Sequence, residues 1–327
     1  MTRRSEVIGW IENGTVPADR IQSALQVTGI LPDTGRWLRF LDRLMLALGA
    51  LSLAASVVFF VAFNWDRLGR FAQFALLQGL LIVAVLFAVK RGPGVLSTQL
   101  GLTVAAILLG ALLALFGQTY QTGADPWQLF ACWALLIVPW VLASRFAPLW
   151  LLWLLLLNLS LLQYYDSAFG LLGVAFFTKD DLAWLLLLVN TAAWALWELA
   201  GRRFDWLSTR RSGRWAVRLV ATVSGAVMTV LVLRAIFDPQ TLAPPVWLVY
   251  FAWLVIVYRV YRRTLPDLFI LAGACLSLIV SFTSLFAELM LKGGDLALSF
   301  LLLALLVVAQ AAFAAVWLRR VHSEGSR

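Results

Sequence analysis

Long apolar runs, separated by short polar segments, dominate the chain from residue 44 onward. A helix that crosses a bilayer needs about 20 predominantly apolar residues, because lipid offers no partner for backbone amides and carbonyls. By this measure we predict ten membrane-spanning helices, at residues 44–64, 71–89, 97–117, 127–143, 148–165, 182–199, 215–236, 245–261, 267–286 and 296–318. The pattern therefore predicts an all-α, polytopic transmembrane helix bundle.

The fourth and fifth of these spans are the least regular. Pro139 interrupts the fourth, and only Ser144 to Ala147 separate the two runs. A proline inside a helix removes one backbone hydrogen bond and kinks the chain. Eight spans with one re-entrant pair are therefore the alternative to ten.

The polar segment before the first span predicts a separate helical element. Thr15 and Pro17 make a plausible helix start before residues 18–25, and residues 36–43 alternate apolar and charged side chains, as a helix lying in the membrane interface does. We predict a cytoplasmic or interfacial helical segment at 1–43, the transmembrane bundle at 44–318 and a cytoplasmic tail at 319–327. Because a polar segment precedes the first apolar run, we expect an uncleaved signal anchor.

The composition supports a membrane protein, and the distribution of charge orients it. The chain of 327 residues is 62% hydrophobic and 13% charged, with a net charge of +9. Cytoplasmic loops of membrane proteins collect lysine and arginine. With the N-terminus inside, all but five of the 26 lysines and arginines fall on the inner side, the exceptions being Arg67, Arg70, Lys179, Arg234 and Lys292. We therefore predict both termini cytoplasmic, a bacterial inner membrane, and anionic lipid rather than nucleic acid as the partner of the positive charge.

Residues that bind metals and cofactors are sparse. Cys132 and Cys275 both fall inside apolar runs, which is typical of packing residues, and the single histidine, His322, lies in the tail. The sequence contains no CxxC or HExxH motif and neither of the glycine-rich phosphate-binding motifs. We expect no metal site and no cofactor.

Three stretches resemble a known family. They are "GWIENGTVPADRI", "FVAFNWDRLGRFA" at the end of the first span, and "FGQTYQTGADPWQLFACWALLIVPW" across the loop before the fourth. Together they resemble the bacterial predicted-membrane-protein family known as domain of unknown function 2157, over roughly residues 5–145. The resemblance implies a multi-pass inner-membrane protein and allows a hetero-complex with another integral membrane protein. It implies no reaction.

Polar side chains gather at the outer ends of the first and third spans. If these helices pack together, amides, a phenol, carboxylates, arginines and indoles converge, which suits a small polar molecule or a lipid headgroup. The alternative is that the same side chains cap helix ends and anchor the membrane interface. The candidate ligand-binding residues are Asn64, Trp65, Asp66, Arg67, Arg70, Gln118, Tyr120, Gln121, Asp125 and Trp127.

The polar residues deep in the spans are neutral. Polar side chains at this depth are costly and usually face the bundle interior. The amides are Gln73, Gln78, Asn158, Asn190 and Gln310, and no aspartate, glutamate, lysine or histidine lies near a bilayer centre. This argues against proton-driven transport, and leaves facilitated or sodium-coupled movement open.

Small and hydroxylated residues form two stripes. Ala106, Gly110 and Ala114 recur every four residues, a spacing that lets helices approach closely. Gly273, Ser277, Ser281 and Ser284 also share one helix face, which would either line a watery path or pack helices.

These observations leave three classes of function. The first is a protein that binds or transports a small polar molecule or lipid through the outer-face site. The second is a non-catalytic membrane subunit of a hetero-complex. The third, a membrane-embedded enzyme for a lipid-linked substrate, has the weakest support, because we identify no catalytic residue.

Overall fold

The protein is described by a computed structural model that covers residues 9–11, 13–27, 34–63, 69–92, 94–168, 179–203, 214–291 and 296–325. Within these ranges the regular structure is helical, with no strand. Near the N-terminus, a 3-10 turn, η1 (Ala18–Arg20), leads into α2 (Ile21–Val27), with Pro17 at the N-cap position. The helix start predicted at Thr15 and Pro17 is therefore confirmed.

Ten long helices follow within the described residues, one at each predicted span. Nine of them, within the described residues, are long and apolar enough to cross a membrane, including both helices of the irregular fourth and fifth spans. The remaining helix, α11, occupies the position of the eighth predicted span. The all-α, multi-span fold is confirmed, with α3 (Thr34–Phe63), α4 (Arg70–Arg91), α5 (Leu96–Tyr120), α6 (Pro126–Ser144), α7 (Ala147–Ala168), α8 (Lys179–Arg203), α10 (Trp215–Phe237), α11 (Pro239–Arg259, continued by the π-helical turn η3, Val260–Thr264), α12 (Leu268–Leu291) and α13 (Leu296–Gly325).

The first long helix, α3, begins well before the first predicted span. It runs without a break through the boundary that we predicted between residues 43 and 44. Trp37 and Phe40 lie on its first turns, with their rings edge to face at 5.8 Å, and both side chains are exposed. The interfacial residues are thus part of the same helix as the first span.

The chain divides into two compact units, Met1–Leu115 with Ser323–Arg327, and Phe116–His322. In the first unit, Leu77 of α4 and Leu108 of α5 form a small core to which Val57 of α3 adds. Ala106 and Gly110 of the predicted small-residue stripe are buried in α5. A Cβ at Gly101 would lie 3.4 Å from both the Ala84 carbonyl oxygen and the Ala88 Cβ, so α5 approaches α4 closely here.

Gly101→Leu is expected to destabilise the protein by about 1–3 kcal/mol, because a larger side chain must push α4 and α5 apart. Gly79→Leu is the matched control, since a Cβ at Gly79 of α4 meets nothing within 4 Å. The measurement is unfolding of the purified protein in detergent. Equal free energies of unfolding for the two variants would contradict close packing at Gly101.

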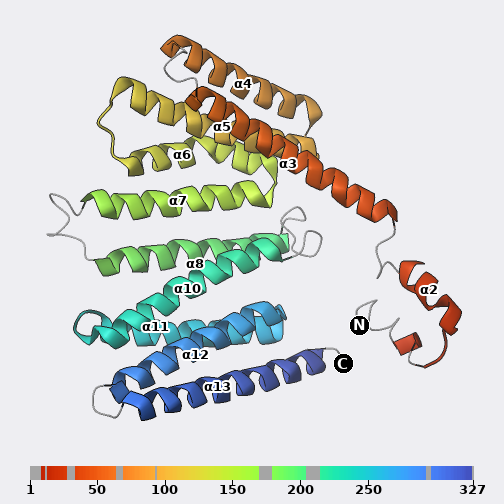
Figure 1. Ribbon diagram of the computed structural model, residues 1–327, viewed down its shortest axis with the longest axis vertical. Coiled ribbons are helices and arrows are strands. Elements are labelled where there is room, and N and C mark those ends of the chain that lie inside the picture. The colour runs from red at the N-terminus through yellow and green to blue at the C-terminus, as the bar shows by residue number, and fades with distance from the viewer. Residues whose placement is uncertain are drawn as a thin grey trace. The chain divides into compact units, whose positions relative to one another are not determined.

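The second unit is organised around α10. Figure 1 shows α6, α7, α8 and α10 as successive neighbours, and α10 contacts α7, α8, α11 and α12. One core cluster, around Val217, Tyr261 and Leu271, joins α7, α8, α10, α11, η3, α12 and α13. A second, around Met228 and Tyr250, joins α8, α10 and α11. These two clusters hold together the helices that carry the charged cluster and the grooves described below.

Candidate functional site

Part of the predicted outer-face site lies outside the described residues, namely Asn64, Trp65, Asp66 and Arg67. Arg70 is exposed at the first residue of α4, in the first compact unit. The other predicted residues belong to the second unit, where the side chains of Gln118, Tyr120, Gln121 and Asp125 are exposed and that of Trp127 is half-buried. Ligand binding by this set stays a prediction.

The loop between α5 and α6 is a tight turn. Gln121 and Gly123 have φ angles of 44° and 64°, in the left-handed region. Asp125 occupies the N-cap position of α6, but makes no side-chain capping hydrogen bond there. Trp127 packs edge to face on Tyr164 of α7 at 5.2 Å, so it anchors α6 to α7. This contact gives Trp127 a packing role between α6 and α7, and its place at the membrane interface stays a prediction.

The deep amides Asn158 and Asn190 bind each other at the middle of α7 and α8. The Asn190 Nδ2 donates to the Asn158 Oδ1 at 2.6 Å, and the Asn158 Nδ2 donates to the Asn190 Oδ1 at 3.3 Å. Each amide nitrogen also donates to a carbonyl of its own helix, those of Leu154 and Leu186. Because both amides have hydrogen-bond partners within the protein, their role is to hold α7 and α8 together.

Hydrogen bonds between hydroxyl groups likewise connect α8 to α10, and α10 and α11 to α12. Thr191 of α8 pairs with Ser224 of α10 at 2.7 Å. Ser277, from the predicted serine stripe, pairs with Thr229 of α10 at 2.8 Å and with the hydroxyl of Tyr250 of α11 at 3.2 Å. These contacts favour packing over a watery path as the role of Ser277.

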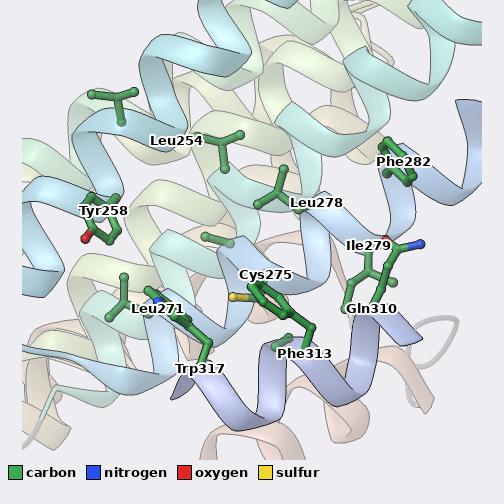
Figure 2. A pocket seen from close by; sticks show the side chains of 13 residues that line it. Leu254, Tyr258, Leu271, Cys275, Leu278, Ile279, Phe282, Gln310, Phe313 and Trp317 are labelled. Carbon is green, nitrogen blue, oxygen red and sulfur yellow. The ribbon is translucent and has the colours of Figure 1, made fainter. Parts of the chain in front are cut away.

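An apolar groove lies between α11, α12 and α13, with a volume of about 620 Å³ (Figure 2). Tyr258 and Trp317 stand together at one end, their ring centroids 6.2 Å apart. Phe282 and Gln310 lie toward the other end, where the Gln310 amide donates to the Thr283 hydroxyl at 3.3 Å. The remaining lining residues are Leu254, Val255, Leu271, Ala274, Cys275, Leu278, Ile279, Phe313 and Ala314.

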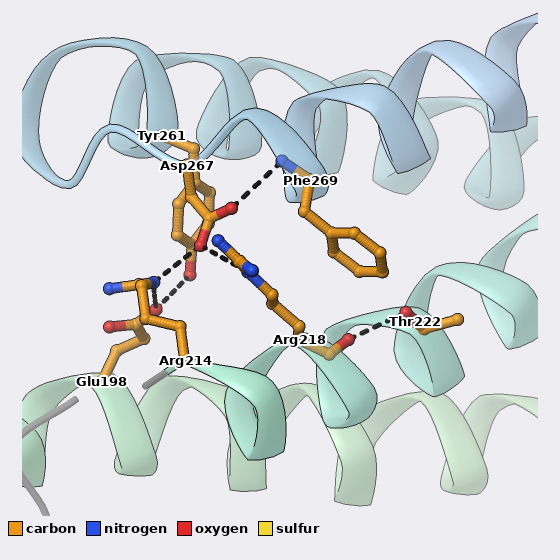
Figure 3. Close-up of polar contacts among 7 residues, drawn as sticks. All are labelled: Glu198, Arg214, Arg218, Thr222, Tyr261, Asp267 and Phe269. Atoms are coloured by element: carbon orange, nitrogen blue, oxygen red, sulfur yellow. Dashed lines mark hydrogen bonds and ion pairs between the residues drawn. The ribbon is translucent and has the colours of Figure 1, made fainter. Parts of the chain in front are cut away.

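Four charged side chains form a cluster where α8 ends and where α10 and α12 begin (Figure 3). The side chain of Asp267 is fully buried, and its Oδ2 accepts from the Nε of Arg214 at 2.7 Å and from the Nε of Arg218 at 3.1 Å. Its Oδ1 accepts from the backbone N–H of Phe269 at 3.0 Å, which caps α12. Glu198 pairs with Arg214 and accepts from the hydroxyl of Tyr261 at 2.8 Å.

The cluster is held in place by aromatic rings. The guanidinium of Arg214 lies 5.8 Å from the ring of Tyr261, which stacks on Trp194 at 5.6 Å. Burial alone would lower the pKa of Arg214, but the charge of Glu198 and the hydrogen bond to Asp267 outweigh it and raise that pKa. Arg214 therefore stays protonated.

Comparison with known proteins concerns the N-terminal part of the chain. Residues 9–150 match the family described as Predicted membrane protein (DUF2157). The match confirms the resemblance carried by the three sequence stretches. No curated protein and no solved structure matches the chain. The DUF2157 match ends within α7, so the charged cluster and the groove both lie beyond it.

Sequence reasoning missed the charged cluster outside the DUF2157 segment. No local pattern links Glu198 or Arg218 to Asp267. Asp267 carries one recognisable signal, since it follows Pro266 and directly precedes an apolar run, as an N-cap residue does. No groups of three or more histidine, cysteine, aspartate or glutamate side chains suited to a metal ion occur in the described ranges.

Proposed function

We propose that the protein binds a membrane lipid, with an acyl chain in the groove between α11, α12 and α13. The observation that supports this most is the groove itself, because a volume of about 620 Å³ is that of a small-molecule site and its walls are almost entirely apolar. Val255, Phe282 and Phe313 line it and are exposed, so the groove opens on the side of the bundle. From Leu271 to Phe282, α12 runs for roughly 16 Å along it.

The polar contacts support lipid rather than a polar solute as the ligand. The amides of Asn158 and Asn190 and the hydroxyl of Ser277 are engaged between helices, where such bonds hold membrane helices together. Among the described residues, no aspartate, glutamate, lysine or arginine lines the groove. With the predicted orientation, we place the protein in the bacterial inner membrane, and Tyr258 and Trp317 at its cytoplasmic interface.

Ala314→Leu is expected to weaken binding of phosphatidylcholine by about tenfold, because the larger side chain fills part of the groove. Ala315→Leu is the matched control, since Ala315 is exposed on the same helix and does not line the groove. Native mass spectrometry of the delipidated protein, titrated with dioleoyl phosphatidylcholine, measures lipid binding by both variants. Equal binding by the two variants would overturn the proposal.

A membrane subunit is the second candidate, and α13 favours it. Its most apolar stretch has no buried residue among those described. A partner helix could cover this face in place of lipid. A second protein that co-purifies with the chain, and is lost on Ala314→Leu, would support the subunit role over lipid binding.

A further inference from the structure

We propose that a second groove, between α10 and α12, binds an anionic phospholipid, with the lipid phosphate on Arg218. This site is separate from the groove of α11–α13, and it shares with the proposed function only the premise that the protein takes up lipid. The second site selects lipids by the charge of their headgroup, which the apolar groove of α11–α13 does not do.

The second groove has a volume of about 530 Å³ and owes its depth to small residues. Gly225 and Ala226 line it from α10, and Gly273 lines it from α12. A Cβ at Gly273 would meet nothing within 4 Å, so this glycine leaves open space. Leu276 and Phe269 also line the groove and are exposed, so a lipid chain can enter it from the side of the bundle.

Arg218 stands at one end of this groove. Its guanidinium lies 5.5 Å from the ring of Phe269, which lines the groove. Thr222, another lining residue, lies one turn further along α10 and donates to the Arg218 carbonyl at 2.8 Å (Figure 3). The Arg218 side chain is 41% exposed, so it is open to a ligand at the membrane surface.

The guanidinium of Arg218 is oriented but not saturated. Its Nε is fixed by the buried Asp267, which also binds Arg214. Among the described residues, neither Nη of Arg218 has a hydrogen-bond partner. Paired N–H groups of arginine match two oxygens of a phosphate, which an ammonium group does not do as well.

The predicted orientation puts Arg218 at the cytoplasmic surface, where anionic lipids attract positive side chains. The groove thus has room for the acyl chain, and Arg218 at its end offers donors to the phosphate.

The test is native mass spectrometry of the full-length protein, titrated with phosphatidylglycerol and phosphatidylcholine that carry the same oleoyl chains. We expect Arg218→Gln to weaken phosphatidylglycerol binding by about tenfold and phosphatidylcholine binding by clearly less, because the choline cation offsets the charge of the phosphate in phosphatidylcholine. Arg259→Gln, at an exposed arginine that ends α11, is the control and should change neither. Loss of equal size in the two arginine variants would overturn the assignment to Arg218.

Gly273→Leu tests whether a lipid acyl chain occupies the groove, and it leaves the charged cluster unchanged. It should remove one bound lipid of either class, because the side chain enters the open space of the groove. Inorganic phosphate alone should not displace phosphatidylglycerol, and displacement would mean an ion site and no lipid site. Unchanged lipid binding by Gly273→Leu overturns this proposal and leaves the α11–α13 groove standing, whereas unchanged binding by Ala314→Leu does the reverse.

Discussion

Asp267→Ala is expected to lower the free energy of unfolding by about 3–5 kcal/mol, the largest effect of any substitution considered. The Asp267 side chain is fully buried and holds the Nε groups of both Arg214 and Arg218. Without it, two positive charges face each other with only Glu198 to compensate, and α12 loses its cap at the Phe269 N–H. Chemical unfolding of the purified protein in detergent measures the loss.

Two controls separate the charge from the cap. Asp267→Asn keeps an oxygen for the Phe269 N–H but removes the charge. Its free energy of unfolding should therefore lie between those of the alanine variant and the unmodified protein. Asp125→Ala removes an exposed carboxylate at the N-cap position of α6, where no side-chain capping bond forms, and should change stability little. An Asp267→Ala protein as stable as Asp125→Ala would contradict the role given to the cluster.

Asn158→Leu and Asn190→Leu are each expected to destabilise the protein by about 1–3 kcal/mol, because either change leaves one buried amide without its partner. The double variant should be less destabilised than the sum of the two, since no amide then remains unpaired. The difference is the coupling energy of the pair, and a double-mutant cycle of unfolding free energies measures it.

The double-mutant cycle can also contradict the pairing of the two amides. Strictly additive changes in unfolding free energy would mean that the amides do not stabilise each other, although their nitrogen and oxygen atoms lie 2.6 and 3.3 Å apart. Each amide would then serve only its own helix, through the Leu154 and Leu186 carbonyls.

The helices were predictable because each span must satisfy its own backbone in lipid, which requires a long apolar run. Even α6 was predictable, although Pro139 lies inside it, because apolar residues continue beyond the proline. The continuity of α3 was not, since Trp37 and Phe40 lie among charged residues, and this alternation predicted an interfacial helix separate from the first span.

The site was harder to predict because its contacts join residues far apart along the chain. Arg214 is 16 residues from Glu198 and 53 from Asp267, and no local pattern reports such pairs. The depth of Asn158 and Asn190 was evident from their apolar neighbours, but their mutual hydrogen bonds depend on how α7 and α8 rotate. The grooves depend on the same rotations, and the second groove also on Gly273, which as part of a stripe predicted either a watery path or helix packing.

The central claim, that the groove between α11, α12 and α13 holds a lipid, is tested most directly by cryo-electron microscopy of the protein in phospholipid nanodiscs. We expect elongated density between Tyr258 and Phe282, along the faces of α12 and α13 that line the groove. Ala314→Leu should shorten or abolish this density. A polypeptide helix in its place, or a groove closed by α13 without any ligand, would contradict lipid binding.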